Sequence, residues 1–265
     1  MKKCTSYDLK LIACISMFID HFGAIFLYEC IVLALNTNIV HPLLDFTRNH
    51  QYFMINLYDT FRMIGRIAFP IYSFLIVQGF VHTRSVSKYC IRLFLFAFLS
   101  EFAFDIGFNH VLFETYSNNV FFTLGLGLIG IIILSKIENV YHAFKDRRSK
   151  IRLNIGCLLS SLGFVLALGI LADDIFRCDY GFSGVLCIVL MYIFRNQITL
   201  GYTLGVLATV FLNDSFIQMY ALFGLLFILN YDGEKGKSMK YFFYLYYPLH
   251  ILLITGLNYL VGIRG

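Results

Sequence analysis

An acid and an imidazole, Asp20 and His21, stand next to each other in the middle of the first long apolar run of the sequence. That run reads LKLIACISMFIDHFGAIFLYECIVLAL and covers residues 9–35. Placing an ionisable side chain at bilayer depth costs at least ~2.5–3.5 kcal/mol, and such groups usually face a polar cavity where they bind, relay protons or do chemistry. Because imidazole titrates near neutral pH, we interpret His21 as a candidate general base.

His21 needs an orienting partner from outside its own helix. Adjacent residues point about 100° apart on an α-helix, so Asp20 cannot form a carboxylate–imidazole dyad with it directly. Glu101, near the middle of the third predicted span, is a candidate for that partner. Asp20 is expected to pair with Arg66 instead, or to close a neighbouring polar network.

The composition indicates which elements position these groups. Of the 265 residues, 59% are hydrophobic and 14% charged, whereas a soluble domain carries about 25% charged residues. Apolar stretches recur along almost the whole chain, so we predict an all-α polytopic membrane protein that forms a single bundle and one domain over residues 1–265. Two of its spans, the sixth and seventh, are short, so eight spans with a re-entrant piece are an alternative to nine. The nine transmembrane helices are predicted near residues 9–32, 60–81, 89–109, 119–138, 152–171, 181–195, 197–213, 215–231 and 240–262.

The predicted loops alternate between basic ones and ones poor in basic residues. Under the positive-inside rule, this places the N-terminus in the cytoplasm of a multi-pass protein of the bacterial plasma membrane. The cluster at residues 145–150 needs no nucleic-acid partner to explain it, because juxtamembrane loops are commonly basic and face membrane lipid. The basic residues are Lys2, Lys3 and Lys10 before the first span, Arg84, Lys88 and Arg92 between the second and third, Lys145, Arg147, Arg148, Lys150 and Arg152 after the fourth, and Lys235, Lys237 and Lys240 before the last.

Two further features of the sequence concern metals and loops. The seven cysteines are scattered and form no CxxC pair, so no metal site is predicted. Residues 36–59 are predicted to be the longest loop, and their aromatic side chains would suit the outer membrane interface.

Polar residues on other predicted spans fall at a depth similar to that of His21. Arg62 and Arg66 are four residues apart, which puts both guanidiniums on one face of the second span. Glu101 and Asp105 have the same spacing on the antiparallel third span. The alternative to a functional site is that these four residues form buried ion pairs that hold the helices in register. The last span adds Tyr247 and His250, and the acidic loop DDIFRCDYG adds Asp179 and Tyr180.

An ordered series of motifs runs along nearly the whole chain. LKLIACISMFIDHFGAIF is followed by RMIGRIAFPIYSFLIVQGFVHT, YCIRLFLFAFLSEFAFDIGF, NVFFTLGLGL, DYGFSGVL, ALFGLL and KYFFYLYYPLHILLI. In order, spacing and residue type, this series resembles the TraX family, whose founding activity is N-terminal acetylation of conjugative pilin. The stretch from residue 36 to 59 is the least similar to that family.

The resemblance implies a membrane-embedded acetyltransferase with acetyl-CoA as its donor, and His21 matches the suspected catalytic histidine of the wider acyltransferase group. His21 would take a proton from an attacking amine or hydroxyl, or would itself be acetylated before transfer. Arg66 or a local donor would stabilise the oxyanion. The acceptor would be a pilin-like peptide N-terminus, a surface glycan or a small amine at or beyond the outer side. The phosphates of CoA would be held by Arg84, Lys88 and Arg92 at the cytoplasmic mouth, or by the loop at residues 145–152.

Two other function classes compete with this hypothesis. Ionisable residues at mid-depth also serve proton-coupled secondary transporters, although no internal repeat is visible in this sequence. A family member that has lost its activity and serves as a membrane scaffold is the third alternative.

Overall fold

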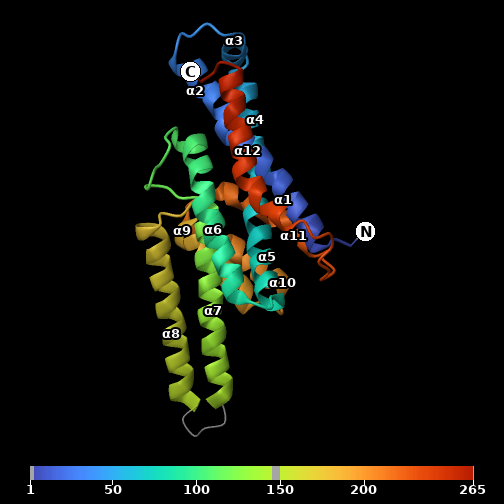
Figure 1. The fold of residues 1–265 in the computed structure, drawn as a ribbon, viewed down its shortest axis with the longest axis vertical. Coiled ribbons are helices and arrows are strands. Elements are labelled where there is room, and N and C mark those ends of the chain that lie inside the picture. Colours follow the sequence, from blue (N-terminus) through green and yellow to red (C-terminus); the bar gives the residue numbers. More distant parts are fainter. Residues whose placement is uncertain (1–2, 145–149, 265) are drawn as a thin grey trace. The chain divides into compact units, whose positions relative to one another are not determined.

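The computed structural model describes residues 3–144 and 150–264 (Figure 1). The chain is 80% helical, and the described residues form no β-strand beyond two isolated bridges. The all-helical class predicted from the apolar runs is therefore confirmed.

Contacts divide the chain into two compact units. The first comprises Met1–Tyr72, Phe98–Glu114 and Phe216–Gly265, and the second comprises Ser73–Ala97 and Thr115–Ser215. The prediction of one domain over residues 1–265 stays a prediction. The first unit contains α1 (Ser6–His21), the π-helical turn η1 (Phe22–Leu27), α2 (Tyr28–Asn36), α3 (Pro42–Asn49), α4 (Gln51–Gly65), the π-helical turn η2 (Asp105–Asn109), the 3-10 helix η4 (Phe216–Gly224), α11 (Leu225–Ile228) and α12 (Lys240–Leu260).

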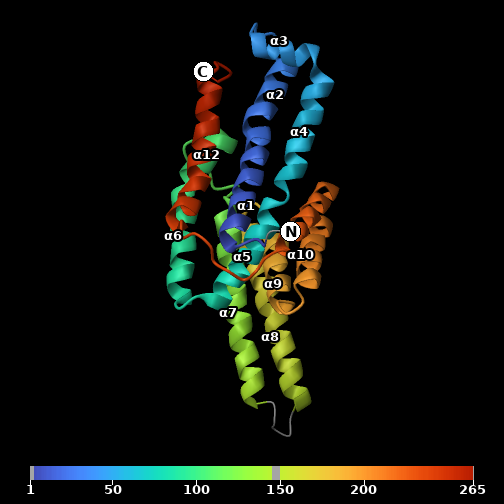
Figure 2. The ribbon, with the colours of Figure 1, turned by 90° about the vertical axis from the view of Figure 1, so that its right-hand side faces the viewer.

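The first long helix of the chain runs without a break through α1, η1 and α2 (Figures 1 and 2). Its start is fixed by a capping box, in which the Thr5 hydroxyl accepts from the Asp8 N–H and the Asp8 carboxylate accepts from the Thr5 N–H at 2.9 Å. Within η1 the ladder widens, because the N–H of Tyr28 donates to the carbonyl of Gly23, five residues back. The π turn therefore begins directly after His21.

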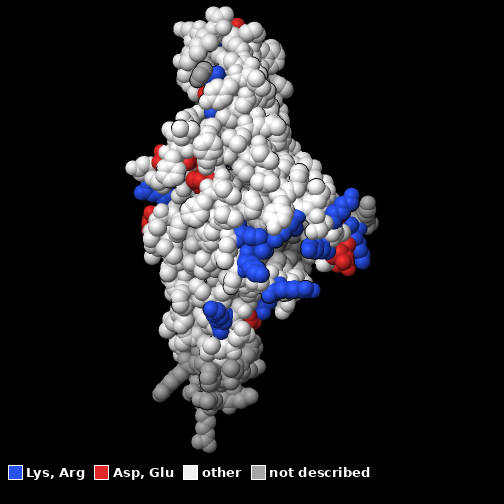
Figure 3. Space-filling model, in the orientation of Figure 1, with Lys and Arg blue, Asp and Glu red and all other residues white. Residues whose placement is uncertain are grey.

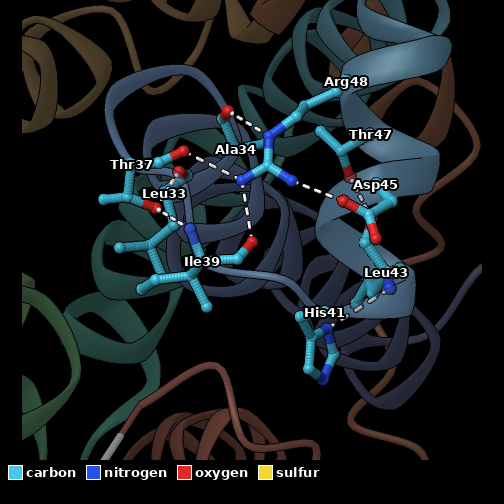
Figure 4. A network of polar contacts seen from close by, with 9 residues as sticks. All are labelled: Leu33, Ala34, Thr37, Ile39, His41, Leu43, Asp45, Thr47 and Arg48. Atoms are coloured by element: carbon cyan, nitrogen blue, oxygen red, sulfur yellow. Dashed lines mark hydrogen bonds and ion pairs between the residues drawn. The ribbon is translucent and has the colours of Figure 1, made fainter.

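Residues 36–59 are mostly helical, so their prediction as the longest loop was wrong. The irregular segment after α2 ends at His41, because α3 (Pro42–Asn49) begins at the next residue. Helix α4 begins at Gln51. Arg48 holds this region together, as Figure 4 shows. Its guanidinium donates to Asp45 at 2.5 Å and also reaches three backbone carbonyls, those of Ala34, Thr37 and Ile39, each at 2.9 Å. One side chain thus satisfies one carbonyl in the last turn of α2 and two in the segment that follows it.

Four helices within the described part of the chain are long and apolar enough to cross a membrane: Ser6–Asn36, Gln51–His82, Val120–Tyr141 and Ile155–Ile175. In the last of these, only 17% of the most apolar window is buried, and Leu158 and Leu159 are more than half exposed. Uncharged residues also make up most of the face drawn in Figure 3. Such surfaces are stable in lipid rather than in water, as expected for a helical membrane protein. Nine crossings and a cytoplasmic N-terminus stay predictions.

The second unit is built around α7 (Val120–Phe144), α8 (Lys150–Ile170), α9 (Gly181–Ile193) and α10 (Ile198–Leu212), with the π-helical turn η3 (Leu171–Ile175) after α8. Helices α7 and α8 lie side by side (Figures 1 and 2), and α9 packs on both of them and on α10. Helix α9 begins at Gly181, the last residue of the DYG motif. The carboxylate of Asp173, on η3, accepts from the N–H of the next residue, Phe182, at 2.7 Å. Gly181 has φ +47°, and a Cβ there would lie 1.9 Å from the Asp173 carboxylate. Only glycine fits this position.

Candidate functional site

Asp20 forms the centre of a buried ion-pair network between α1 and α4. Its carboxylate accepts from Arg62 at 2.8 Å and from Arg66 at 2.6 Å, one guanidinium on each oxygen. The Nε of Arg66 also donates to the carbonyl of Arg62 at 3.0 Å, which fixes the guanidinium against its own helix. Asp20 and Arg66 are each 8% exposed. Charge-assisted pairs of this geometry hold two helices in one register.

The end of α4 makes room for this network. Arg66 and Ile67 donate to carbonyls only three residues back, so the helix tightens there before α5 (Ala68–His82) begins. The hydroxyl of Ser16 donates to the carbonyl of Ile64 at 2.7 Å, which satisfies one of the acceptors at this break. Gly65 has no Cβ, and Asp20 fills the space that one would take.

Replacing Gly65 by Ala should therefore destabilise the protein by about 1–3 kcal/mol, because overpacking a buried contact forces side chains or backbone to move. An added Cβ would lie 2.1 Å from Asp20 Oδ1 and 2.3 Å from Asp20 Cβ. The measurement is thermal unfolding of the purified protein in detergent. Gly163→Ala on α8 is the matched control, because a Cβ there meets nothing within 4 Å. Equal midpoints for the two variants would contradict the close approach at Gly65.

His21 is oriented by His250, on α12. The Nδ1 of His21 lies 2.7 Å from the Nε2 of His250, and the Nδ1 of His250 lies 2.7 Å from the carbonyl oxygen of Tyr246. The two rings are nearly parallel, with centroids 4.8 Å apart. His250 is 4% exposed, whereas His21 is only partly buried.

For two neutral rings, these contacts define the tautomers. A carbonyl oxygen can only accept, so Nδ1 of His250 carries the proton that it donates to Tyr246. Its Nε2 is then an acceptor, and Nδ1 of His21 must donate to it. The Nε2 of His21 is left with a lone pair, and no hydrogen bond engages it within residues 3–144 and 150–264. The histidine pair thus presents one basic nitrogen.

Aromatic rings surround the imidazole of His21. The rings of Phe108 and Tyr247 meet His21 edge-on, with centroids 5.2 and 5.9 Å away. Phe108 belongs to η2, whose carbonyls at Ile106 and Gly107 accept from Arg264, each at 3.4 Å. The C-terminal end of the chain therefore helps to position one wall of the site.

Arg264 also affects a histidine beside η2. Its guanidinium lies 3.0 Å from the Nε2 of His110, and Glu29 lies 3.7 Å from the same nitrogen. Burial lowers the pKa of His110, and the positive charge of Arg264 lowers it further, while Glu29 raises it.

Two predicted contacts are wrong. Glu101 does not orient His21, because His250 does so. Asp105 does not pair with an arginine: its carboxylate is fully buried and accepts from the Asn109 amide at 3.0 Å and the Glu114 N–H at 2.8 Å. The sequence placed these acids at a suitable depth, but depth alone does not define the face of the helix to which a side chain points. Glu101 is buried on α6 (Val86–Phe104), and any catalytic part it plays stays a prediction.

The remaining predicted residues lie in the second unit. Arg84 and Lys88 are exposed at the turn between α5 and α6, and Arg92 lies over the ring of Tyr89 at 5.8 Å. The side chains of the basic loop at residues 145–152 lie outside the described residues. Asp179 and Tyr180 immediately precede α9, where Tyr180 is its N-cap and accepts from the Ser183 hydroxyl.

Sequence reasoning missed three contributors to the site: Gly65, Phe108 and Tyr246. The signal for Gly65 is its place directly before Arg66 in the motif RMIGR, where a conformationally free residue adjoins a buried charge. Tyr246 acts through its backbone carbonyl and stacks on His250, four residues later, with ring centroids 4.9 Å apart. No residue type signals a backbone acceptor, so this contact needed the structure.

The TraX protein family profile matches residues 6–258. The chain belongs to the TraX family. A curated relative, the probable fimbrial assembly protein FimC, serogroup H1, of Dichelobacter nodosus, is 27% identical over 282 aligned positions that cover 94% of this chain and 94% of that protein. No solved structure matches this TraX-family chain. The histidine pair and the Asp20 network both lie within the part of the chain that matches the TraX profile.

Proposed function

We propose that this TraX-family chain is an acetyltransferase of the bacterial plasma membrane that moves an acetyl group from acetyl-CoA to an acceptor at or beyond the outer side. In this proposal the chain crosses the membrane nine times, with its N-terminus in the cytoplasm. The single observation that carries the proposal is the basic Nε2 of His21, which His250 and Tyr246 fix in one tautomer.

The proposed reaction is proton transfer coupled to acyl transfer. The amine or hydroxyl of the acceptor attacks the carbonyl carbon of the thioester and gives its proton to Nε2 of His21. The tetrahedral intermediate then collapses, the C–S bond breaks, and the imidazolium returns the proton to the leaving thiolate. The products are the acetylated acceptor and free CoA, and His21 ends in its starting state. His250 acts through His21 and is a positioning residue in this scheme.

In the proposal Arg66 also has a structural part, through the pairing with Asp20 that was expected from the sequence. Two of its donors are committed, one to Asp20 and one to the carbonyl of Arg62. In the proposal, Asp20 with its two arginines holds α1, and therefore His21, at a fixed height against α4. Stabilisation of the oxyanion by Arg66 stays a prediction.

The acceptor is proposed to be a peptide N-terminus of a pilin-like protein, with a surface glycan or amine as the alternative. Support comes from the relative in Dichelobacter nodosus, whose name is that of a probable fimbrial assembly protein.

Mass spectrometry of cell-envelope proteins and glycans tests the proposal. Cells that express the chain should carry an acetylated envelope component that cells without it lack. Re-expression of the wild-type chain should restore the modification. An unchanged set of acetylated components, with the chain demonstrably present in one strain only, would refute the proposal.

A further inference from the structure

Four lysines gather where α1 and α12 begin: Lys10 on α1, Lys235 and Lys237 on the preceding loop, and Lys240 at the start of α12. We refer to them as the lysine cluster. All four belong to the first unit, which also contains His21 and His250.

Backbone pairing holds the loop of the cluster against the start of α1. The N–H of Cys4 donates to the carbonyl of Asn230 at 2.8 Å, and the N–H of Asp232 donates to the carbonyl of Cys4 at 3.0 Å. The N–H of Ser6 donates to the carbonyl of Glu234 at 2.8 Å. The lysines on this loop therefore have a defined place beside α1.

Aromatic rings alternate with the ammonium groups. The Nζ of Lys10 lies 5.5 Å from the ring centroid of Phe243, and the Nζ of Lys237 lies 6.0 Å from that of Tyr7. The two rings meet edge-on at 5.7 Å. Tyr241, 65% exposed, lies below the Nζ of Lys240. Cations beside aromatic rings, of which Tyr241 is exposed and Tyr7 and Phe243 are half-buried, suit the phosphates and the base of a nucleotide.

Two acids near the cluster accept hydrogen bonds from the backbone. The carboxylate of Asp8 accepts from Thr5, and that of Asp232 accepts from the Glu234 N–H at 2.8 Å. Among the residues that the structure describes, no carboxylate oxygen lies within 4.0 Å of the ammonium of Lys10, Lys235 or Lys237. Lys235 acts electrostatically on Lys10, so the two like charges are close to each other. An anion would relieve that repulsion.

The cluster stands at a useful distance from His21. Lys10 and His21 are eleven positions apart on one helix, and Lys240 and His250 are ten positions apart on another, which corresponds to about 15–17 Å at a rise of about 1.5 Å per residue. Both helices that carry the histidine pair therefore begin at the lysine cluster. The separation is comparable with the length of an extended pantetheine arm.

We infer that the lysine cluster binds the phosphates of a nucleotide thioester and places its acyl group beside His21. The inference rests on the proposed function and gives the donor a different anchor from Arg84, Lys88 and Arg92. The ligand chemistry is phosphate, which a lipid headgroup also offers. The interleaved rings favour the nucleotide.

Calorimetric binding of CoA to the full-length protein in zwitterionic phosphatidylcholine nanodiscs tests the inference. The double variant K10Q/K235Q should bind CoA about tenfold more weakly or worse, because two charge-assisted contacts to phosphate are lost. The matched double variant K136Q/R177Q removes two exposed positive charges of the second unit and should bind CoA as the wild type does. Pantetheine, which lacks the phosphates, should bind all three proteins equally.

Four outcomes would overturn the inference. Equal CoA affinity of K10Q/K235Q and K136Q/R177Q, with unchanged thermal midpoints, removes the cluster as an anchor. Loss of affinity in R84Q/K88Q/R92Q and not in K10Q/K235Q moves the anchor to the second unit and leaves the proposed acetyl transfer intact. Loss of CoA binding when anionic phosphatidylglycerol is added at constant ionic strength assigns the cluster to lipid headgroups. Absence of CoA binding to the wild type overturns the proposed function as well.

Discussion

Replacing His21 by Gln should lower the rate of the proposed acetyl transfer by about 10²–10⁴-fold, the contribution that a positioned general acid–base makes. Gln retains an N–H that can donate to Nε2 of His250, so the helix contact survives while the basic nitrogen is lost. The measurement is transfer of labelled acetyl from acetyl-CoA to an acceptor in membranes that contain equal amounts of each variant.

The His250→Gln variant distinguishes the proposed general base, His21, from the residue that positions it, His250. It should lower kcat and leave the KM for acetyl-CoA unchanged, because it disturbs only the tautomer and orientation of His21. His50→Gln is the matched control, since His50 is exposed and its Nδ1 only bonds the carbonyl of Phe46, one turn earlier. Full activity of the His21→Gln variant would rule out both direct transfer and an acetyl-histidine intermediate.

Replacing Asp20 by Ala should destabilise the protein by about 3–5 kcal/mol, because removal of one partner leaves uncompensated buried charge. Here two guanidiniums, those of Arg62 and Arg66, lose their shared carboxylate. Thermal unfolding in detergent measures the loss. Asp20→Asn keeps the side-chain volume and removes the charge, so this variant should recover only part of the stability lost in Asp20→Ala.

Asp45→Ala is the matched control for this prediction. Asp45 also pairs with an arginine, Arg48, but its side chain is 48% exposed. Exposed ion pairs contribute about 0–1 kcal/mol, so this variant should unfold close to the wild type. Equal destabilisation by Asp20→Ala and Asp45→Ala would show that the Asp20 network does not hold α1 against α4.

Helix content could be predicted from the apolar runs, whereas helix boundaries could not. Residues 36–59 have a mixed composition, and their helices depend on Pro42 at the start of α3 and on the carbonyls that Arg48 satisfies. Those are contacts between residues up to fourteen positions apart. A sliding window averages over such positions and cannot detect them.

The site could be predicted as a set of residues but only partly as a set of contacts. The pairing of Asp20 with Arg66 was among the sequence-based alternatives and is the one observed. His250 was a candidate residue, yet its contact with His21 depends on the packing of α1 against α12, 229 positions apart in sequence. Glu101 has suitable chemistry and a suitable depth, but His250 occupies the position beside Nδ1 of His21.

The π turn Phe22–Leu27 has a consequence for comparing this chain with its relatives. A π turn holds one residue more than an α-helical turn of similar rise, so it is equivalent to a single-residue insertion after His21. Every residue beyond it is rotated by about 100° relative to an uninterrupted helix. Cys30 and Ala34 are the buried residues of the helix beyond this turn. A homologue with an uninterrupted helix that is one residue shorter between His21 and Tyr28 would align with a gap there, retain the Asp-His pair, and pack the same side of its first helix against the rest of the protein. Chain length at this point therefore carries structural information that residue identity does not.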